Sequence, residues 1–328
     1  MQRQLLTLSV ALLVHFDAAA QDQSAYDRLV KEAWTLYEAK NYEGSARSYS
    51  DAFKALGWKG TSGDRYNAAC SYALWGIPDS AYFHLFRIAE RMDYSNLSHL
   101  TTDADLNSLH GDPRWEQLTA LVKANKERLE ANLDKPLVAL LDSIFDEDQG
   151  LRRQIDEVEE RFGRDSPEMQ DHWRRIVEKD SLNLLAVKRI LDERGWLGPD
   201  VVGGKGNQTL FLVIQHSDQA TQETYLPMMR EAVAQGNARA SSLALLEDRV
   251  ALGRGERQTY GSQIGFDEDT GSSFLLPLED PDNVDVRRAA MGLGPLSEYM
   301  ARFGLTWDVE AYKRELPAIE ARQKARRP

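Results

Sequence analysis

The sequence predicts a mainly α-helical protein: a short solenoid of helical hairpins, then a second, predominantly helical domain with a small β-hairpin. Three observations support this fold class. Apolar residues recur with the 3.6-residue period of a helix along much of the chain. Near the N-terminus a residue pattern recurs after 36 positions. Around residues 258–278, two strand-like segments flank a turn rich in Asp and Gly.

Residues 1–20 have the features of a secretory signal peptide. Arg3 supplies a positive charge, Leu5 to Val14 is largely apolar, and three alanines at 18–20 fit the cleavage rule. The apolar run is shorter than the ~20 residues of a membrane-spanning helix, and no later segment is a better candidate. The alternative is an uncleaved amphipathic N-terminus. We therefore expect an exported chain, periplasmic or secreted, that starts at Gln21 and has no membrane span after cleavage.

Charge and cysteine content exclude several classes of function. The formal net charge of −12 argues against general binding to nucleic acid or to an anionic membrane, since both need clustered Lys and Arg. The single cysteine, Cys70, excludes an intrachain disulfide and sites built from several thiolates. The histidines show no H-x-x-x-H or H-E-x-x-H spacing. The sequence thus predicts no metal and no cofactor, although one His together with Asp148 and Asp248 remains a weaker alternative.

The first predicted domain, residues 21–130, contains the repeat. Ser45, Tyr49 and Ala52 recur as Ala81, Leu85 and Ile88. The period suits a two-helix unit, and one such unit cannot bury its apolar face alone. Further on, Asp112 before Pro113 is a sound helix start, because Asp is a good N-cap and Pro is favoured at the first helical position.

These residues resemble tetratricopeptide repeats. Tyr42, Tyr49 and Ala52 occupy consensus positions, Ser45 replaces the usual Ala, and the terminal Pro is missing. The stretch from Tyr66 to Trp115 resembles the variant that closes a group of such repeats in bacterial proteins. The resemblance implies a short curved solenoid whose concave side binds a protein or peptide partner. A spacer or lid for the second domain is an equal alternative.

In the second predicted domain, residues 134–328, polar residues occupy apolar positions. Asp148 falls in an apolar helical stripe that runs from Leu137 through Ile144 to Leu151, and Arg152 lies one turn beyond it. An exposed i,i+4 pair between Asp148 and Arg152 is the simple interpretation. Because the flanking positions are apolar, we instead expect a buried Asp148 that must be paired or protonated.

Three later helices carry similar intrusions. Asn183 shares a face with Val187 on a helix that we expect to begin at Asp180, His216 ends an apolar run, and Asp248 lies among leucines. A loop that follows supplies amides and a hydroxyl, from Gln258, Tyr260 and Gln263. Buried polar groups need partners, and other buried polar groups are the nearest available ones. We therefore expect all of them to converge on one site.

The same region resembles an uncharacterised bacterial family of exported or envelope proteins, often found downstream of such repeats. The resemblance spans roughly 137–304 and has no established activity to transfer. The residues that carry it are Asp148–Gln149, Arg152, Asp180, Asn183, Gly195–Trp196, Val202–Gly203, Gln215–His216, Leu246, Asp248–Arg249, Gln258, Tyr260–Gly261, Gln263, Arg287–Arg288 and Gly292–Leu293.

Three functions remain open from the sequence, and whether the protein is an enzyme is not decided. The first is binding or scaffolding, in which Gln149, Arg152, Asn183, Gln258, Tyr260 and Gln263 hold a polar small molecule, glycan or envelope partner. The second is a hydrolase acting on a polar envelope polymer or peptide. There His216 is the general acid or base, Asp148 or Asp248 orients it, and water attacks, because no nucleophile motif is present. The third is a purely structural network.

Overall fold

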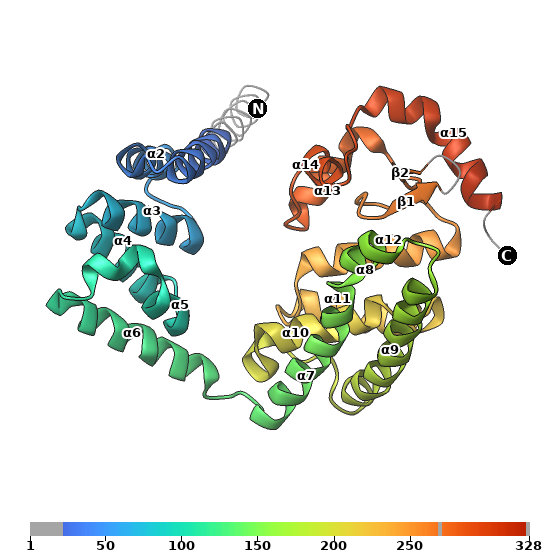
Figure 1. Cartoon of the computed structure of the whole chain (residues 1–328), viewed down its shortest axis with the longest axis horizontal. Coiled ribbons are helices and arrows are strands. Elements are labelled where there is room, and N and C mark those ends of the chain that lie inside the picture. The colour runs from blue at the N-terminus through green and yellow to red at the C-terminus, as the bar shows by residue number, and fades with distance from the viewer. Residues whose placement is uncertain (1–21, 268–270, 326–328) are drawn as a thin grey trace, which may run out of the picture. The chain divides into compact units, whose positions relative to one another are not determined.

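The computed structural model describes residues 22–267 and 271–325, and the chain divides into two compact units, Met1–Ala131 and Asn132–Pro328 (Figure 1). The predicted signal peptide lies outside the described residues. The division falls close to the boundary expected near Asp134. That residue belongs to the second unit, since its backbone N–H donates to Val201 O at 2.9 Å and its carboxylate pairs with Arg194.

The first unit consists of antiparallel helical hairpins. Its opening helix covers residues 22–38. The remaining elements are α2 (Tyr42–Ala55), α3 (Ser62–Trp75), α4 (Pro78–Arg91), α5 (Leu97–Thr102), the 3-10 helix η1 (Ala104–Leu109) and α6 (Pro113–Glu130).

Small residues let these helices approach closely. Ala33, Tyr49 and Phe53 are buried together in one cluster, and Ser45 on α2 hydrogen-bonds Ser71 on α3 at 2.9 Å. Asp112 caps α6, with Pro113 at its first position. The helical hairpins are compatible with the repeat resemblance.

The second unit is a helical bundle followed by a small β-hairpin and short terminal helices. Its elements are α7 (Lys135–Arg152), α8 (Ile155–Phe162), α9 (Pro167–Arg194), α10 (Pro199–Gln215), α11 (Gln219–Ala234), α12 (Ala240–Arg254), β1 (Ile264–Asp267), β2 (Ser272–Leu275), η2 (Pro281–Asn283), α13 (Val284–Ala290), α14 (Leu296–Ala301) and α15 (Val309–Ala325).

The close packing of α7 against α10 determines where the side chains of Asp148 and His216 lie. A Cβ on Gly206 would lie 3.2 Å from the Leu141 side chain, so a larger residue there would require Leu141 to shift. Gly203 kinks α10 with a φ of 70°, a conformation that other residues rarely adopt. Asp148 on α7 and His216 at the end of α10 are thereby placed on neighbouring helices.

Helix α9 begins earlier than the sequence suggested. Asp180 and Ser181 were expected to open it, but it starts at Pro167, where Ser166 accepts a hydrogen bond from Met169 N. Ser181 instead donates its hydroxyl to Val177 O at 2.8 Å inside the helix. Asp180 is therefore a mid-helix residue whose carboxylate is free to contact other helices.

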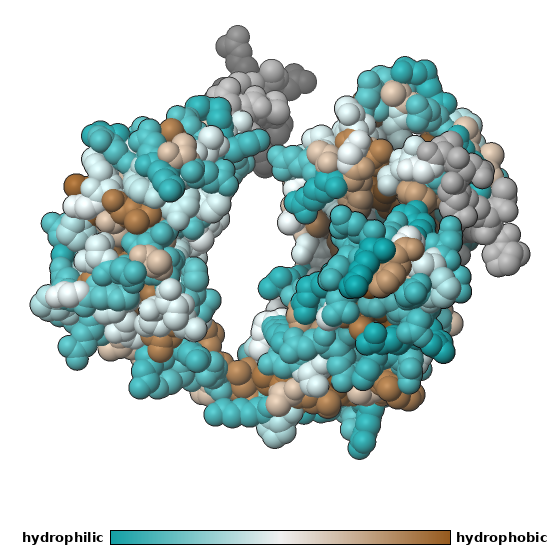
Figure 2. Space-filling view, in the orientation of Figure 1, coloured by the Kyte–Doolittle hydropathy of each residue, from teal (hydrophilic) through white to brown (hydrophobic). Residues whose placement is uncertain are grey.

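The hairpin pairs β1 with β2 antiparallel, from Ile264 opposite Leu275 to Asp267 opposite Ser272. The segment at Gln258 forms an isolated bridge to Leu278 instead of the first strand. The predicted fold class, mainly α with a small β-hairpin, is confirmed. Figure 2 shows that the visible surface of each unit is mostly hydrophilic, with scattered apolar patches. Among the described helices, none is both long and apolar enough to cross a membrane.

A fragment of residues 132–328 is expected to fold alone, because its apolar core is made within the unit. Thermal unfolding followed by circular dichroism should give one cooperative transition. A gradual, non-cooperative loss of signal would contradict the boundary.

Candidate functional site

Asp148 is an almost completely buried carboxylate in the second unit, 1% exposed. Its Oδ1 accepts hydrogen bonds from Arg152 Nη1 and from His216 Nδ1, both at 3.0 Å. Its Oδ2 accepts from Gln149 Nε2 at 2.6 Å. A buried charge is tolerated only when paired and hydrogen-bonded, and here donors from two helices meet that need.

The surroundings of Asp148 keep its carboxylate ionised, and this sets which nitrogen of His216 faces it. Burial by itself raises the pKa of Asp148, but the bonds from His216 and Gln149 and the charge of Arg152 outweigh it and hold the pKa below its usual value. An ionised carboxylate only accepts, so Nδ1 of His216 carries the proton. In the neutral imidazole, Nε2 is then an unprotonated acceptor and base.

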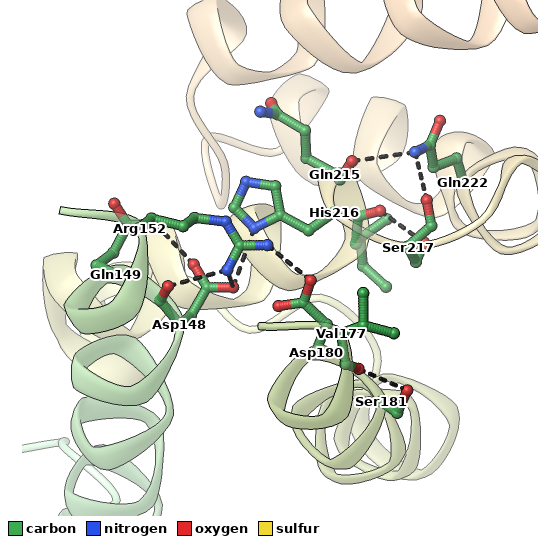
Figure 3. Close-up of polar contacts among 11 residues, drawn as sticks. Asp148, Gln149, Arg152, Val177, Asp180, Ser181, Gln215, His216, Ser217 and Gln222 are labelled. Atoms are coloured by element: carbon green, nitrogen blue, oxygen red, sulfur yellow. Dashed lines mark hydrogen bonds and ion pairs between the residues drawn. The ribbon is translucent and has the colours of Figure 1, made fainter. Parts of the chain in front are cut away.

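The turn between α10 and α11 places His216. Gln222 donates to the carbonyls of Gln215 and Ser217, at 3.0 and 2.8 Å, where α10 ends and its carbonyls lack helical partners. Asp218 caps α11 by accepting from Thr221 N. Figure 3 shows one ring nitrogen of His216 facing Asp148 and the other pointing away. That second atom, Nε2, has no hydrogen bond with any described residue, and the side chain is 16% exposed.

A second carboxylate joins this network through Arg152. Arg152 Nη2 donates to Asp180 Oδ2 at 2.7 Å, while Nη1 binds Asp148. One guanidinium therefore serves two carboxylates on α7 and α9. The other oxygen, Asp180 Oδ1, is buried and has no hydrogen-bond donor among the described residues.

These groups border a pocket of about 190 Å³ between α7, α9 and the end of α10. Its polar wall is made of Asp148, Asp180, Ser181, His216, Ser217 and Asp218. Val177, Leu184 and Val213 form the apolar wall. The pocket thus combines an oriented imidazole, carboxylates and hydrocarbon, a composition typical of small-molecule sites.

Asp248 belongs to a different network, so the expectation of one convergent site is wrong. It is 0% exposed and accepts from the backbone N–H groups of Thr259, Tyr260 and Ser262 at 2.7 to 2.9 Å. Burial raises its pKa, and these hydrogen bonds oppose the rise. No hydrogen bond between described residues links Asp248 to Asp148 or His216. Asp148, and not Asp248, orients the imidazole.

The predicted ligand-binding residues of the 258–263 loop also have partners within the chain. Gln258 Nε2 donates to the carbonyls of Gln263 and Leu276, and its Oε1 accepts from Gln263 N. Tyr260 donates its hydroxyl to Glu247, and Gln263 donates to Ser262 Oγ. The hydrogen bond from Gln258 to Leu276 O ties the loop to the residue that directly follows β2.

Of the other predicted residues, Gln149 and Arg152 belong to the Asp148 network and Asn183 to neither. Gln149 and Arg152 lie in the Asp148 network, where they bind protein carboxylates. Asn183 is 3% exposed on α9, and its Nδ2 has no hydrogen-bond partner among the described residues. It does not line the His216 pocket.

One comparison with known proteins gives a match. The model of a family of unknown function (DUF6624) matches residues 132–311. The chain belongs to this family. No curated protein and no solved structure matches the chain. Both the Asp148 and the Asp248 networks lie inside the DUF6624 region, and the family carries no assigned reaction.

Two clusters have the donor atoms that a metal ion uses. In the DUF6624 region, Asp148, Asp180 and His216 bring ligand atoms within 4.8 Å of one another, but Arg152 already supplies positive charge to both carboxylates. In the first unit, Cys70 lies with Asp103 and Asp105. Burial raises the pKa of the Cys70 thiol, which keeps it protonated and a poor metal ligand.

The sequence reasoning did not assign a site role to four pocket residues, Asp180, Ser181, Ser217 and Asp218. Asp180 and Ser181 were interpreted as a helix start. The signal available for Asp180 was its place one turn before Asn183 on the same helix. For Asp218, the signal was an N-cap residue directly after His216 and Ser217.

The Asp148→Asn substitution should lower the unfolding free energy by about 3 kcal/mol at pH 7, because it leaves Arg152 and His216 without their buried anion. The folded-state pKa of Asp148 is depressed. Its contribution is therefore present above the unfolded pKa of about 3.9 and is lost as pH falls through the folded pKa. Urea titrations from pH 7 to pH 3 should show the difference from wild type shrinking below about pH 4.

Asp171→Asn is the matched control for this series, because Asp171 lies on α9 with its side chain 48% exposed. Its effect should stay within about 0.5 kcal/mol throughout. Equal stability of wild type and Asp148→Asn at pH 7 would show that the buried pair is not formed.

Proposed function

We propose that the C-terminal unit binds a polar small ligand, or a polar group of an envelope partner, in the His216 pocket. The observation that carries the proposal is the state of His216. Its Nδ1 is fixed by the buried Asp148, its partly exposed side chain lines the pocket, and its Nε2 has no hydrogen bond with any described residue. Holding an imidazole in one tautomer with one nitrogen free is useful to a binding site and adds nothing to a sealed core.

Unsatisfied polar atoms nearby support the same proposal. Asp180 Oδ1 and Gln222 Oε1 are buried without a donor among the described residues. Gln222 is the residue that fixes the turn at Ser217, and Asp180 lines the pocket. Buried acceptors without partners are rare in native proteins and call for water or a ligand. By contrast, Gln258 and Asp248 are satisfied within the chain, which favours a structural role for them.

His216→Ala is expected to stay folded and to lose ligand-dependent stabilisation. A panel of sugars, amino acids and short peptides would be screened by thermal shift against wild type, and each hit repeated on the variant. His110→Ala is the control, since His110 is exposed in the other unit. If His216→Ala instead unfolds by more than about 2 kcal/mol and no compound separates it from wild type, the network is structural and the proposal fails.

A hydrolase is the second candidate, favoured by the 3.0 Å hydrogen bond between Asp148 and His216 Nδ1. In that mechanism Nε2 takes a proton from water, the water oxygen attacks the substrate, and the imidazolium later donates the proton to the leaving group. The Asp148 carboxylate holds the tautomer and stabilises the imidazolium. Mass spectrometry of the same panel after incubation distinguishes the two functions: binding leaves the compounds intact, and hydrolysis adds water.

For the first unit, the proposed function is docking of a protein or peptide partner. The support is the stack of helical hairpins together with exposed aromatic side chains, Trp34 at 45% and Phe83 at 50%. Monomeric proteins often use such residues at interfaces.

We also propose that the chain is exported, on the strength of the features of residues 1–20. Mass spectrometry of the protein isolated from an envelope or secreted fraction should give an N-terminal peptide that starts at Gln21. Recovery of an intact Met1 from that fraction would contradict cleavage after Ala20.

A further inference from the structure

We propose that the ligand of the His216 pocket carries a primary ammonium group bonded to aliphatic carbon. The proposal rests on the proposed binding function and names the ligand class. It follows from the hydrogen-bonding character of the pocket wall: its polar groups offer acceptors toward the cavity, and their donors are already used.

The two serine hydroxyls show this most directly. Ser181 donates to Val177 O at 2.8 Å, and Ser217 donates to Ile214 O at 2.7 Å. A hydroxyl has one proton and two lone pairs, so each oxygen keeps acceptor capacity only. Helix carbonyls have thus removed the donors that a neutral sugar or an anion would need.

The other polar groups of the wall are acceptors as well. Asp180 brings a carboxylate to the wall, and its buried Oδ1 has no donor among the described residues, because Arg152 binds Oδ2. His216 uses its Nδ1 in the hydrogen bond with Asp148, so this nitrogen is not available as a donor to a ligand. An ammonium has three donors and no acceptor, which complements this set better than a hydroxyl or an amide does.

Charge points the same way. The carboxylates Asp148, Asp180 and Asp218 line the pocket, and no Lys or Arg lines it. Arg152 neutralises one charge of the Asp148 and Asp180 pair. Asp218 stays ionised, because the hydrogen bond that it accepts from Thr221 N leads the effects that lower its pKa, with a smaller effect from Lys188. The net charge of the three carboxylates and Arg152 is therefore negative.

Size and apolar lining decide against a bare metal ion as the natural occupant. A pocket of about 190 Å³ has room for several non-hydrogen atoms, and Val177, Leu184 and Val213 suit methylene groups. Figure 3 shows Val177 beside Asp180 on α9, facing the turn that carries Ser217. Val177 is 61% exposed, so it marks the open side of the pocket.

The test uses isothermal titration of the full chain at pH 7, where both amines are mainly protonated, with matched pairs of probes. Nα-acetyl-lysine amide is compared with Nα-acetyl-norleucine amide, which lacks the ammonium, and glucosamine with N-acetylglucosamine. We expect each amine to bind at least about tenfold more tightly than its neutral partner. The first pair reports a peptide side chain as the source and the second an amino sugar.

Two variants at one position make the test independent of folding. Val177→Lys places a tethered ammonium at the pocket wall and should abolish amine binding by occupying the site itself. Val177→Met has similar length without charge and should retain the preference for amines. Asp180→Asn, which removes the buried acceptor charge, should weaken the amine at least about tenfold.

The outcomes separate the two proposals. If neutral probes bind as tightly as amines and His216→Ala abolishes both, the binding function stands and the ammonium inference is wrong. Binding of Zn²⁺ or Mg²⁺ alone, with no amine binding, also overturns it. If no probe or metal binds, both proposals fail.

Discussion

The bundle of the C-terminal unit is organised around one buried anion, the Asp148 carboxylate. It occupies a position in the apolar stripe of α7 where a leucine would bury no charge. Removing a carboxylate from water costs several kcal/mol unless donors replace the water. Arg152 comes from the same helix, His216 from the end of α10, and Asp180 of α9 holds Arg152 from the other side. Three helices are therefore tied to the same charge.

The unit contains a second buried carboxylate that is treated differently. Asp248 accepts hydrogen bonds from three backbone N–H groups of one loop, and among the described residues no side-chain cation hydrogen-bonds it; Arg288 interacts with it only through its charge. Arg288 completes that region by donating to Tyr260 O and Gly294 O. Backbone donors hold a loop shape and leave nothing open to a ligand. Side-chain donors from separate helices, as at Asp148, leave an imidazole edge exposed, which is the property that a binding or catalytic site requires.

The sequence predicted what depends on local periodicity. The burial of Asp148 and its pairing with Arg152 follow from positions one turn apart on one helix, and both are present. The mainly α class and the hairpin were predictable in the same way. For the partner of His216 the sequence left a choice between Asp148 and Asp248, because Asp148 lies 68 residues away and a stripe position indicates burial without indicating a neighbour. For that reason two separate networks were merged into one expected site.

The start of α9 shows a related limit. Asp180 and Ser181 are good capping residues, but Ser166 with Pro167 is also a sound start, and apolar packing carries the helix through. Local preference alone could not decide between the two starts.

The chemistry of the pocket follows from that continuous helix. Inside a helix, a serine hydroxyl donates back to a carbonyl one turn earlier, as Ser181 does to Val177. At the end of α10, Ser217 does the same to Ile214. Because both hydroxyls donate to backbone carbonyls, their oxygens can only accept from a ligand. The hydrogen bond to Asp148 occupies Nδ1 of His216 in the same way. The surrounding secondary structure therefore determines that these serine oxygens accept hydrogen bonds from a ligand but donate none. If α9 ended before Ser181, the Ser181 hydroxyl would be free to donate, and the pocket would recognise a different ligand.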